Sequence, residues 1–273
     1  MRAFLLAAAV IVVAAASPVA AQETVRLHAA GSLRQALTEA AEAYERASGV
    51  RVVATFAASG LLRERLAGGE ASDVFASANM EHPQALAEAG KSGPVALFAR
   101  NKLCALARPG LDVTTATLLE RMLDPSVKLG TSTPRADPSG DYAWELFRRA
   151  ERVRAGSFGR LETKALQLTG GPNSPPPPPG RSVYAAAIRD GGADLFLAYC
   201  NVSHAARAEW PELRVIDVPP ELAVGADYGL TVLRGAAPRG ADFALFILSP
   251  AGQRILARNG FDAPALPLTG DSR

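Results

Sequence analysis

Short apolar runs alternate with amphipathic segments along this chain, and small residues form the turns between them. The first unit is a strand over residues 24–30, a turn at Gly31 and Ser32, and a helix over 32–47 whose apolar side chains recur at helical spacing. We expect Ser32 to cap that helix. A strand that runs into a helix presents free backbone N–H groups at the positive end of the helix dipole, so this unit predicts an anion-binding turn.

The same alternation continues downstream and predicts an α/β chain, in which helical crossovers join parallel strands. A second copy of the first unit follows at once, with its turn at Ser59 and Gly60. We expect further strands at 50–56, 72–78, 97–107, 127–131, 194–199, 213–218 and 228–233, and further helices at 61–66, 81–89, 117–123, 142–150, 182–190, 243–248 and 253–259.

Composition and motifs exclude several classes of function. The net charge is only +2, from 29 basic and 27 acidic residues, so neither a nucleic acid nor an anionic membrane is the expected partner. The three histidines, His28, His82 and His204, form no ligand-spaced pair. The sequence also lacks a nucleophile elbow and a nucleotide phosphate loop. We therefore expect no metal centre, no cofactor and no catalytic residues.

The first 21 residues resemble a secretory signal peptide, because Arg2 precedes a short apolar run and small residues precede Gln22. Without a lipid-attachment cysteine there, the sequence predicts a soluble exported protein. Export to an oxidising compartment makes a disulfide between Cys104 and Cys200 reasonable, since both lie in strand-like runs. Two buried free thiols are an equal alternative at this point.

Residues 175–179 are five consecutive prolines, which favour an extended polyproline segment. A linker between domains and a docking ligand for an aromatic groove are both compatible with this composition. We favour a stiff surface loop, because α/β sequence resumes at residue 182.

Small polar residues gather where expected strands end, at the turns already described, at Ser139 and Gly140, around Arg181, and at Tyr199. Ligands of open α/β sheets bind at the carboxyl ends of strands. Hydroxyl and backbone N–H groups are donors that suit an oxyanion. Any single serine here is more simply a helix cap, but several in one exported chain favour a binding site.

The segments 29–33, 56–60, 73–78, 137–143 and 197–199, in this order and spacing, resemble the periplasmic molybdate-binding proteins of ABC importers. The resemblance implies a type II periplasmic binding protein fold, in which a two-strand hinge joins two α/β lobes around a ligand cleft. Lobe I would comprise residues 22–99 and 226–273, and lobe II residues 100–225.

The resemblance also implies a ligand set. The oxyanion would be bound by the hydroxyls of Ser32 and Ser59, by the backbone at Ser139, and by Tyr199, with molybdenum present only inside the bound oxyanion. Counting back from Tyr199 puts the remaining donor at Arg181, which departs from the family pattern. Turn donors would flank these residues at Gly31, Gly60 and Gly140.

The resulting hypothesis is a periplasmic, monomeric solute-binding protein that delivers molybdate, tungstate or a related tetrahedral oxyanion to an ABC permease and ATPase. An exported enzyme acting on a phosphate or sulfate ester is the alternative, based on the polar cluster Arg135, Asp137, Asp141 and Tyr199. An anion-sensing protein for a membrane receptor would have the same site.

Overall fold

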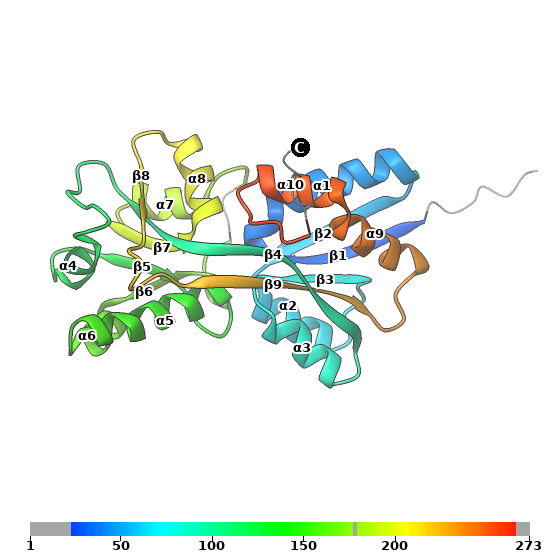
Figure 1. Cartoon of the computed structure of the whole chain (residues 1–273), viewed down its shortest axis with the longest axis horizontal. Coiled ribbons are helices and arrows are strands. Elements are labelled where there is room, and N and C mark those ends of the chain that lie inside the picture. Colours follow the sequence, from blue (N-terminus) through cyan, green and yellow to red (C-terminus); the bar gives the residue numbers. More distant parts are fainter. Residues whose placement is uncertain (1–22, 177–178, 266–273) are drawn as a thin grey trace, which may run out of the picture.

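The computed structural model describes residues 23–176 and 179–265 and consists of two halves joined by long strands (Figure 1). The expected signal peptide lies outside the described residues, as do two of the five consecutive prolines. Among the helices that are described, none has the length and apolar character needed to cross a bilayer.

The elements alternate as the sequence predicts. The strands are β1 (Thr24–Ala30), β2 (Arg51–Ala57), β3 (Val74–Ser77), β4 (Ser92–Ala107), β5 (Leu129–Ser132), β6 (Leu166–Thr169), β7 (Leu195–Tyr199), β8 (Arg214–Asp217) and β9 (Gly225–Leu233). The helices are η1 (Gly31–Leu33), α1 (Arg34–Ser48), α2 (Ser59–Ala67), α3 (Glu81–Glu88), α4 (Leu118–Leu123), α5 (Pro138–Val153), α6 (Ser157–Lys164), α7 (Val183–Arg189), α8 (Cys200–Glu209), α9 (Pro238–Leu248) and α10 (Pro250–Arg258).

The strands form two mixed sheets that share β4. The first sheet has the order β2-β1-β3-β9-β4, and the second has the order β4-β7-β5-β6, with β8 also paired to β4. The predicted parallel pairing is confirmed for β1 with β2 and with β3. In contrast, β9 pairs antiparallel with both β3 and β4.

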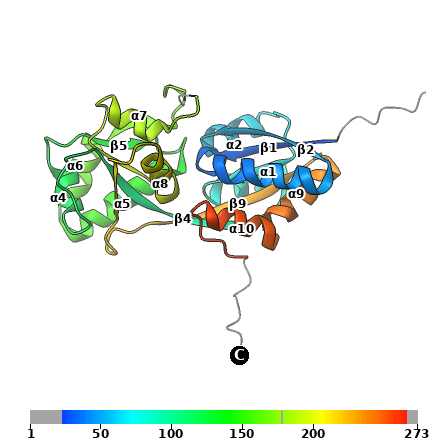
Figure 2. The ribbon, with the colours of Figure 1, turned by 90° about the horizontal axis from the view of Figure 1, so that it is seen from above.

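The strand β4 passes from one sheet to the other without a break. It pairs with β9 from Ser92 to Lys102 and with β7 from Leu103 onward. We call the half containing β1–β3, α1–α3, α9 and α10 lobe I, and the half containing β5–β8 and α4–α8 lobe II. Figure 2 shows the two lobes from above, with β4 between them. The predicted boundaries at 99/100 and 225/226 fall within β4 and β9, and they stay predictions.

Helices cover both faces of each sheet and bury the apolar stripes that define them (Figure 1). In lobe I, α1 and α9 meet where the rings of Tyr44 and Phe243 lie 5.2 Å apart. In lobe II, Phe147 of α5 and Leu197 of β7 are fully buried in the same core. Each lobe is therefore well packed around its sheet. The ends of the strands and helices remain available to form a site.

Several elements differ from the sequence prediction. The helix α5 begins at Pro138 rather than at residue 142, because Asp137 caps it and proline is favoured in the first helical turn. The helix α8 follows β7 directly at Cys200, so no turn residue marks its start. The short elements α6 and β6 were not predicted.

A disulfide joins Cys104 of β4 to Cys200, the first residue of α8. The pairing of β4 with β7 brings the two residues together, since Leu103 lies opposite Tyr199 and Cys104 opposite Ala198. The bond closes a loop across 96 residues of lobe II. Closing such a loop restricts the unfolded chain and thereby stabilises the folded state.

We expect replacement of both Cys104 and Cys200 by alanine to lower the free energy of unfolding by about 2–5 kcal/mol. Chemical denaturation followed by circular dichroism measures this. The wild-type protein treated with a thiol reductant is the matched control and should unfold at the same denaturant concentration as the double variant. An unchanged free energy of unfolding in the double variant would contradict the expectation.

Candidate functional site

A small cavity of ≈ 40 Å³ lies between the two lobes and is the candidate site. Residues from both lobes line it: Ala30, Gly31, Ser32, Ala58, Ser59 and Ala78 from lobe I, and Asp137, Tyr184 and Tyr199 from lobe II. A cavity needs about 10–15 Å³ to hold one water molecule, so this cavity suits a group of only a few atoms.

Ser32 follows β1 and lies in the short helix η1 that precedes α1. The expectation that it caps the helix is wrong, because neither helix start has a side-chain cap. Instead Ser32 Oγ lies 3.0 Å from the hydroxyl oxygen of Tyr228, which is buried in β9. Burial raises the pKa of Tyr228 well above its usual value, so this hydroxyl keeps its proton. When Tyr228 donates to Ser32, the proton of Ser32 is available to a ligand.

Ser59 is the first residue of α2, directly after β2 and a single connecting residue, Ala58. It is 1% exposed, and its Oγ accepts a hydrogen bond of 3.1 Å from the N–H of Ala78. Because that bond occupies a lone pair, the hydroxyl proton remains available to a ligand. The start of α2 has no side-chain cap, so its first N–H groups add positive potential.

Two tyrosines line the cavity from lobe II. Tyr199 ends β7, is 1% exposed and donates its hydroxyl to the carbonyl oxygen of Ala78 in lobe I at 3.4 Å. Tyr184 lies in the first turn of α7 and packs its ring against Phe196, with centroids 5.2 Å apart. Burial raises the pKa of both tyrosines, so both are neutral hydroxyl donors.

Of the described residues that line the small cavity, Asp137 is the one with a charged side chain. Its Oδ1 accepts a 3.0 Å hydrogen bond from the N–H of Ser139, so this structure already uses the backbone donor expected at Ser139. Ser139 itself is fully buried and does not line the cavity. Burial raises the pKa of Asp137 to about 6, although the bond from Ser139 opposes that shift.

Arg181 lies outside the small cavity. Its Nε is 3.5 Å from Glu209 Oε1, and its side chain is about half exposed. It borders a second, wider cavity between the lobes. The helix α7 begins at Val183, one residue later than predicted, and the side chain that reaches the small cavity from this helix start is Tyr184.

The expected turn glycines have different roles. Gly31 lines the small cavity. The N–H of Gly60 donates to the carbonyl oxygen of Ala136 at 2.8 Å, which is a backbone contact between the lobes, and the N–H of Gly140 donates to the carbonyl oxygen of Asp137. A second contact between the lobes joins the side-chain amide of Asn201 to the carbonyl oxygen of Ser32 at 2.9 Å. The lobes are therefore in direct contact around the cavity.

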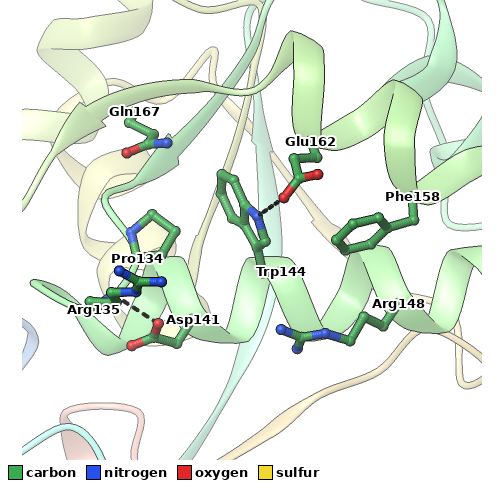
Figure 3. A pocket seen from close by; sticks show the side chains of 8 residues that line it. All are labelled: Pro134, Arg135, Asp141, Trp144, Arg148, Phe158, Glu162 and Gln167. Atoms are coloured by element: carbon green, nitrogen blue, oxygen red, sulfur yellow. Dashed lines mark hydrogen bonds between the residues drawn. The ribbon is translucent and has the colours of Figure 1, made fainter.

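A cavity of ≈ 630 Å³ lies within lobe II, away from the interlobe site (Figure 3). Arg135 and Asp141 line it, and the N–H of Arg135 donates to Asp141 Oδ1 at 2.8 Å. Asp137 and Tyr199 line the small cavity instead. The polar cluster proposed for an enzyme is thus divided between two cavities.

Sequence reasoning did not assign Tyr184 to the site, and it considered Asp137 only for the enzyme hypothesis. A signal was present for Tyr184, because Ser182 is a strong helix cap and caps α7 through the N–H of Ala185. For Asp137 the signal was the Asp-Pro-Ser-Gly order, which is typical of a capped helix start. Neither pattern reveals which side chain faces a cavity.

The bacterial extracellular solute-binding protein family matches residues 25–262 of this chain. An uncharacterised protein of Pasteurella multocida, PM1146, is 35% identical over 241 residues, which cover 87% of this chain and 98% of that protein. The molybdate-binding protein ModA of Mycobacterium bovis is 27% identical over 261 residues, covering 91% and 88% of the two chains.

Among solved structures, the sulfate-binding protein SubI of Mycobacterium tuberculosis aligns with a TM-score of 0.72 at 17% identity, covering 89% of this chain and 87% of that one. The α/β periplasmic binding protein fold expected from the sequence is therefore confirmed. The matching family is one of binding proteins rather than enzymes. The chain belongs to the bacterial extracellular solute-binding protein family.

Proposed function

We propose that this protein is the periplasmic receptor of an ABC importer and binds a small tetrahedral oxyanion, molybdate or a related anion, in the cavity between its lobes. The observation that carries this proposal is the set of hydroxyls from Ser32, Ser59, Tyr184 and Tyr199 that line one cavity from both lobes. The ModA relative, which matches across most of the chain, supports molybdate as the first anion to test.

The chemistry of the cavity suits an anion that is bound by hydrogen bonds rather than by ion pairs. Among the described residues, no lysine or arginine lines it, so hydroxyl protons and the uncapped start of α2 would supply the positive potential. Hydrogen bonds from such donors to a charged acceptor are stronger than those between neutral groups. A cage of fixed donors also favours anions of matching size.

Contact between the lobes would retain the anion. The backbone bond from Gly60 to Ala136 and the bond from Asn201 to Ser32 both bridge the lobes. We expect these bonds to break when the lobes open and the anion leaves, as in hinge closure around a ligand. Permease and ATPase partners would recognise the closed form.

We expect Ser32→Ala and Ser59→Ala each to weaken oxyanion binding by about 1.5–3 kcal/mol, because each removes a hydrogen bond to a charged group. Isothermal titration with molybdate, tungstate and sulfate measures the change. Ser203→Ala is the matched control, since Ser203 is fully buried in lobe II and lines neither interlobe cavity. Unchanged affinity in both cavity variants would place the binding site elsewhere.

We expect oxyanion affinity to rise as the pH falls through about 6, because protonation of Asp137 removes a negative charge from the cavity. Sulfate is a suitable probe, since it stays fully ionised from about pH 5 to about pH 8. Asp137→Asn keeps a helix cap and should bind sulfate at about pH 7.5 at least ~10-fold more tightly than the wild type, with little pH dependence. If the wild type and Asp137→Asn showed the same pH dependence of sulfate affinity, Asp137 would be excluded as the cause of that dependence.

We expect Gly60→Ala to hinder closure of the lobes. An added Cβ atom would lie 2.3 Å from the carbonyl oxygen of Arg135 and 2.7 Å from that of Ala136. Relief of that overlap should cost about 1–3 kcal/mol of binding free energy. Gly159→Ala, where a Cβ would meet nothing within 4 Å, is the control. Two results together would disprove a role of the Gly60–Ala136 contact in closure. These are wild-type affinity in Gly60→Ala and an unchanged radius of gyration of its anion-bound form in X-ray scattering.

A further inference from the structure

A wider cavity of ≈ 280 Å³ lies next to the small one. The two cavities are adjacent because Gly31, Ser32 and Tyr184 line both. Both lobes border each cavity. In the wider cavity, α1 of lobe I supplies one wall, and α7 and α8 of lobe II supply the other. A ligand that bridges the two cavities would be enclosed when the lobes meet.

The wider cavity differs in chemistry from the smaller one. Four of its lining residues are aliphatic: Ala36, Val183, Val202 and Ala205. Among the described residues, the charged ones that line it are Arg34 and Arg181, and Arg181 is paired with Glu209. Arg34 is held over the ring of Phe56, with its guanidinium carbon 4.7 Å from the ring centroid. Aliphatic walls with a few polar groups are typical of sites for organic ligands.

An inorganic oxyanion has only about five heavy atoms and would use the smaller cavity alone, which leaves the aliphatic walls in contact with water. Asp137 also affects how much negative charge the cavity accepts on a bound anion. A carboxylate beside the anion disfavours a dianion such as sulfate or molybdate more than a monoanion such as an alkyl sulfonate.

We propose that the ligand of this protein is an organic oxyanion, with its tetrahedral anionic head in the small cavity and a carbon substituent of a few atoms in the wider cavity. The proposal rests on the function proposed above, namely that the small cavity holds an oxyanion. It assigns the aliphatic residues of α7 and α8 to specificity, and it assigns Arg34 to electrostatic attraction of the ligand.

Titration calorimetry on the wild-type protein tests the ligand class. The probes are phosphate monoesters, alkyl phosphonates and alkyl sulfonates, each compared with inorganic phosphate or sulfate, and molybdate is included. We expect at least one organic anion to bind ~10-fold or more tightly than its inorganic parent and than molybdate. Equal or tighter binding of the inorganic anions would overturn the inference while leaving the proposed oxyanion site intact.

The variant Ala205→Phe tests the wider cavity. Ala205 is an exposed residue of α8, so a larger side chain there should fill the cavity without disturbing the core. We expect Ala205→Phe to weaken binding of the organic anion by ~10-fold or more and to change binding of inorganic anions less than about twofold. Ala85→Phe, on an exposed position of α3, is the matched control and should bind both as the wild type does.

Two other results would count against the inference. If Ala205→Phe weakened binding of organic and inorganic anions equally, its effect would come from disturbance of the small cavity. The wider cavity would then hold no part of the ligand. Absence of binding by every anion in the panel would overturn the proposed function itself, and the inference with it.

Discussion

The pairing of β4 with β9 joins the two lobes and sets where they meet. These two antiparallel strands pair from Ser92 with Leu233 to Lys102 with Gly225, and β4 then continues into the second sheet. One strand thus belongs to both lobes, so the lobes meet at a defined place. The ends of β1 and β2 from one lobe and of β7 from the other face each other across that junction, and the candidate cavity lies there.

Buried tyrosine hydroxyls connect β9, one of the two strands that join the lobes, to the candidate site. Tyr228 of β9 reaches Ser32, and its ring lies 5.5 Å from that of Tyr199, which in turn reaches the carbonyl oxygen of Ala78. Burying a hydroxyl is costly unless it is hydrogen-bonded, so these partners fix the side chains in position. A ligand that binds Ser32 would therefore meet a donor already oriented by the hinge strand.

Asp137 adds a carboxylate to a cavity whose serines supply only hydroxyl groups. It caps α5 through the N–H of Ser139 and at the same time lines the cavity. One carboxylate thus has two effects, since it stabilises a helix start and also makes the cavity less favourable to highly charged anions. The proposal of an organic oxyanion combines this feature with the aliphatic walls of the wider cavity nearby.

Local sequence patterns were enough to predict the α/β class, the order of most elements and the turns at Ser32 and Ser59, because apolar periodicity and small turn residues act over a few neighbouring positions. Which side chains share a cavity followed only from the three-dimensional packing. The pairing of Arg181 with Glu209 and the position of Tyr184 at the cavity depend on contacts between residues far apart in the chain, on which local sequence patterns contain no information. The bond from the N–H of Ser139 to Asp137 is local and follows the pattern of a capped helix start, but the position of Asp137 at the cavity again depends on the tertiary fold.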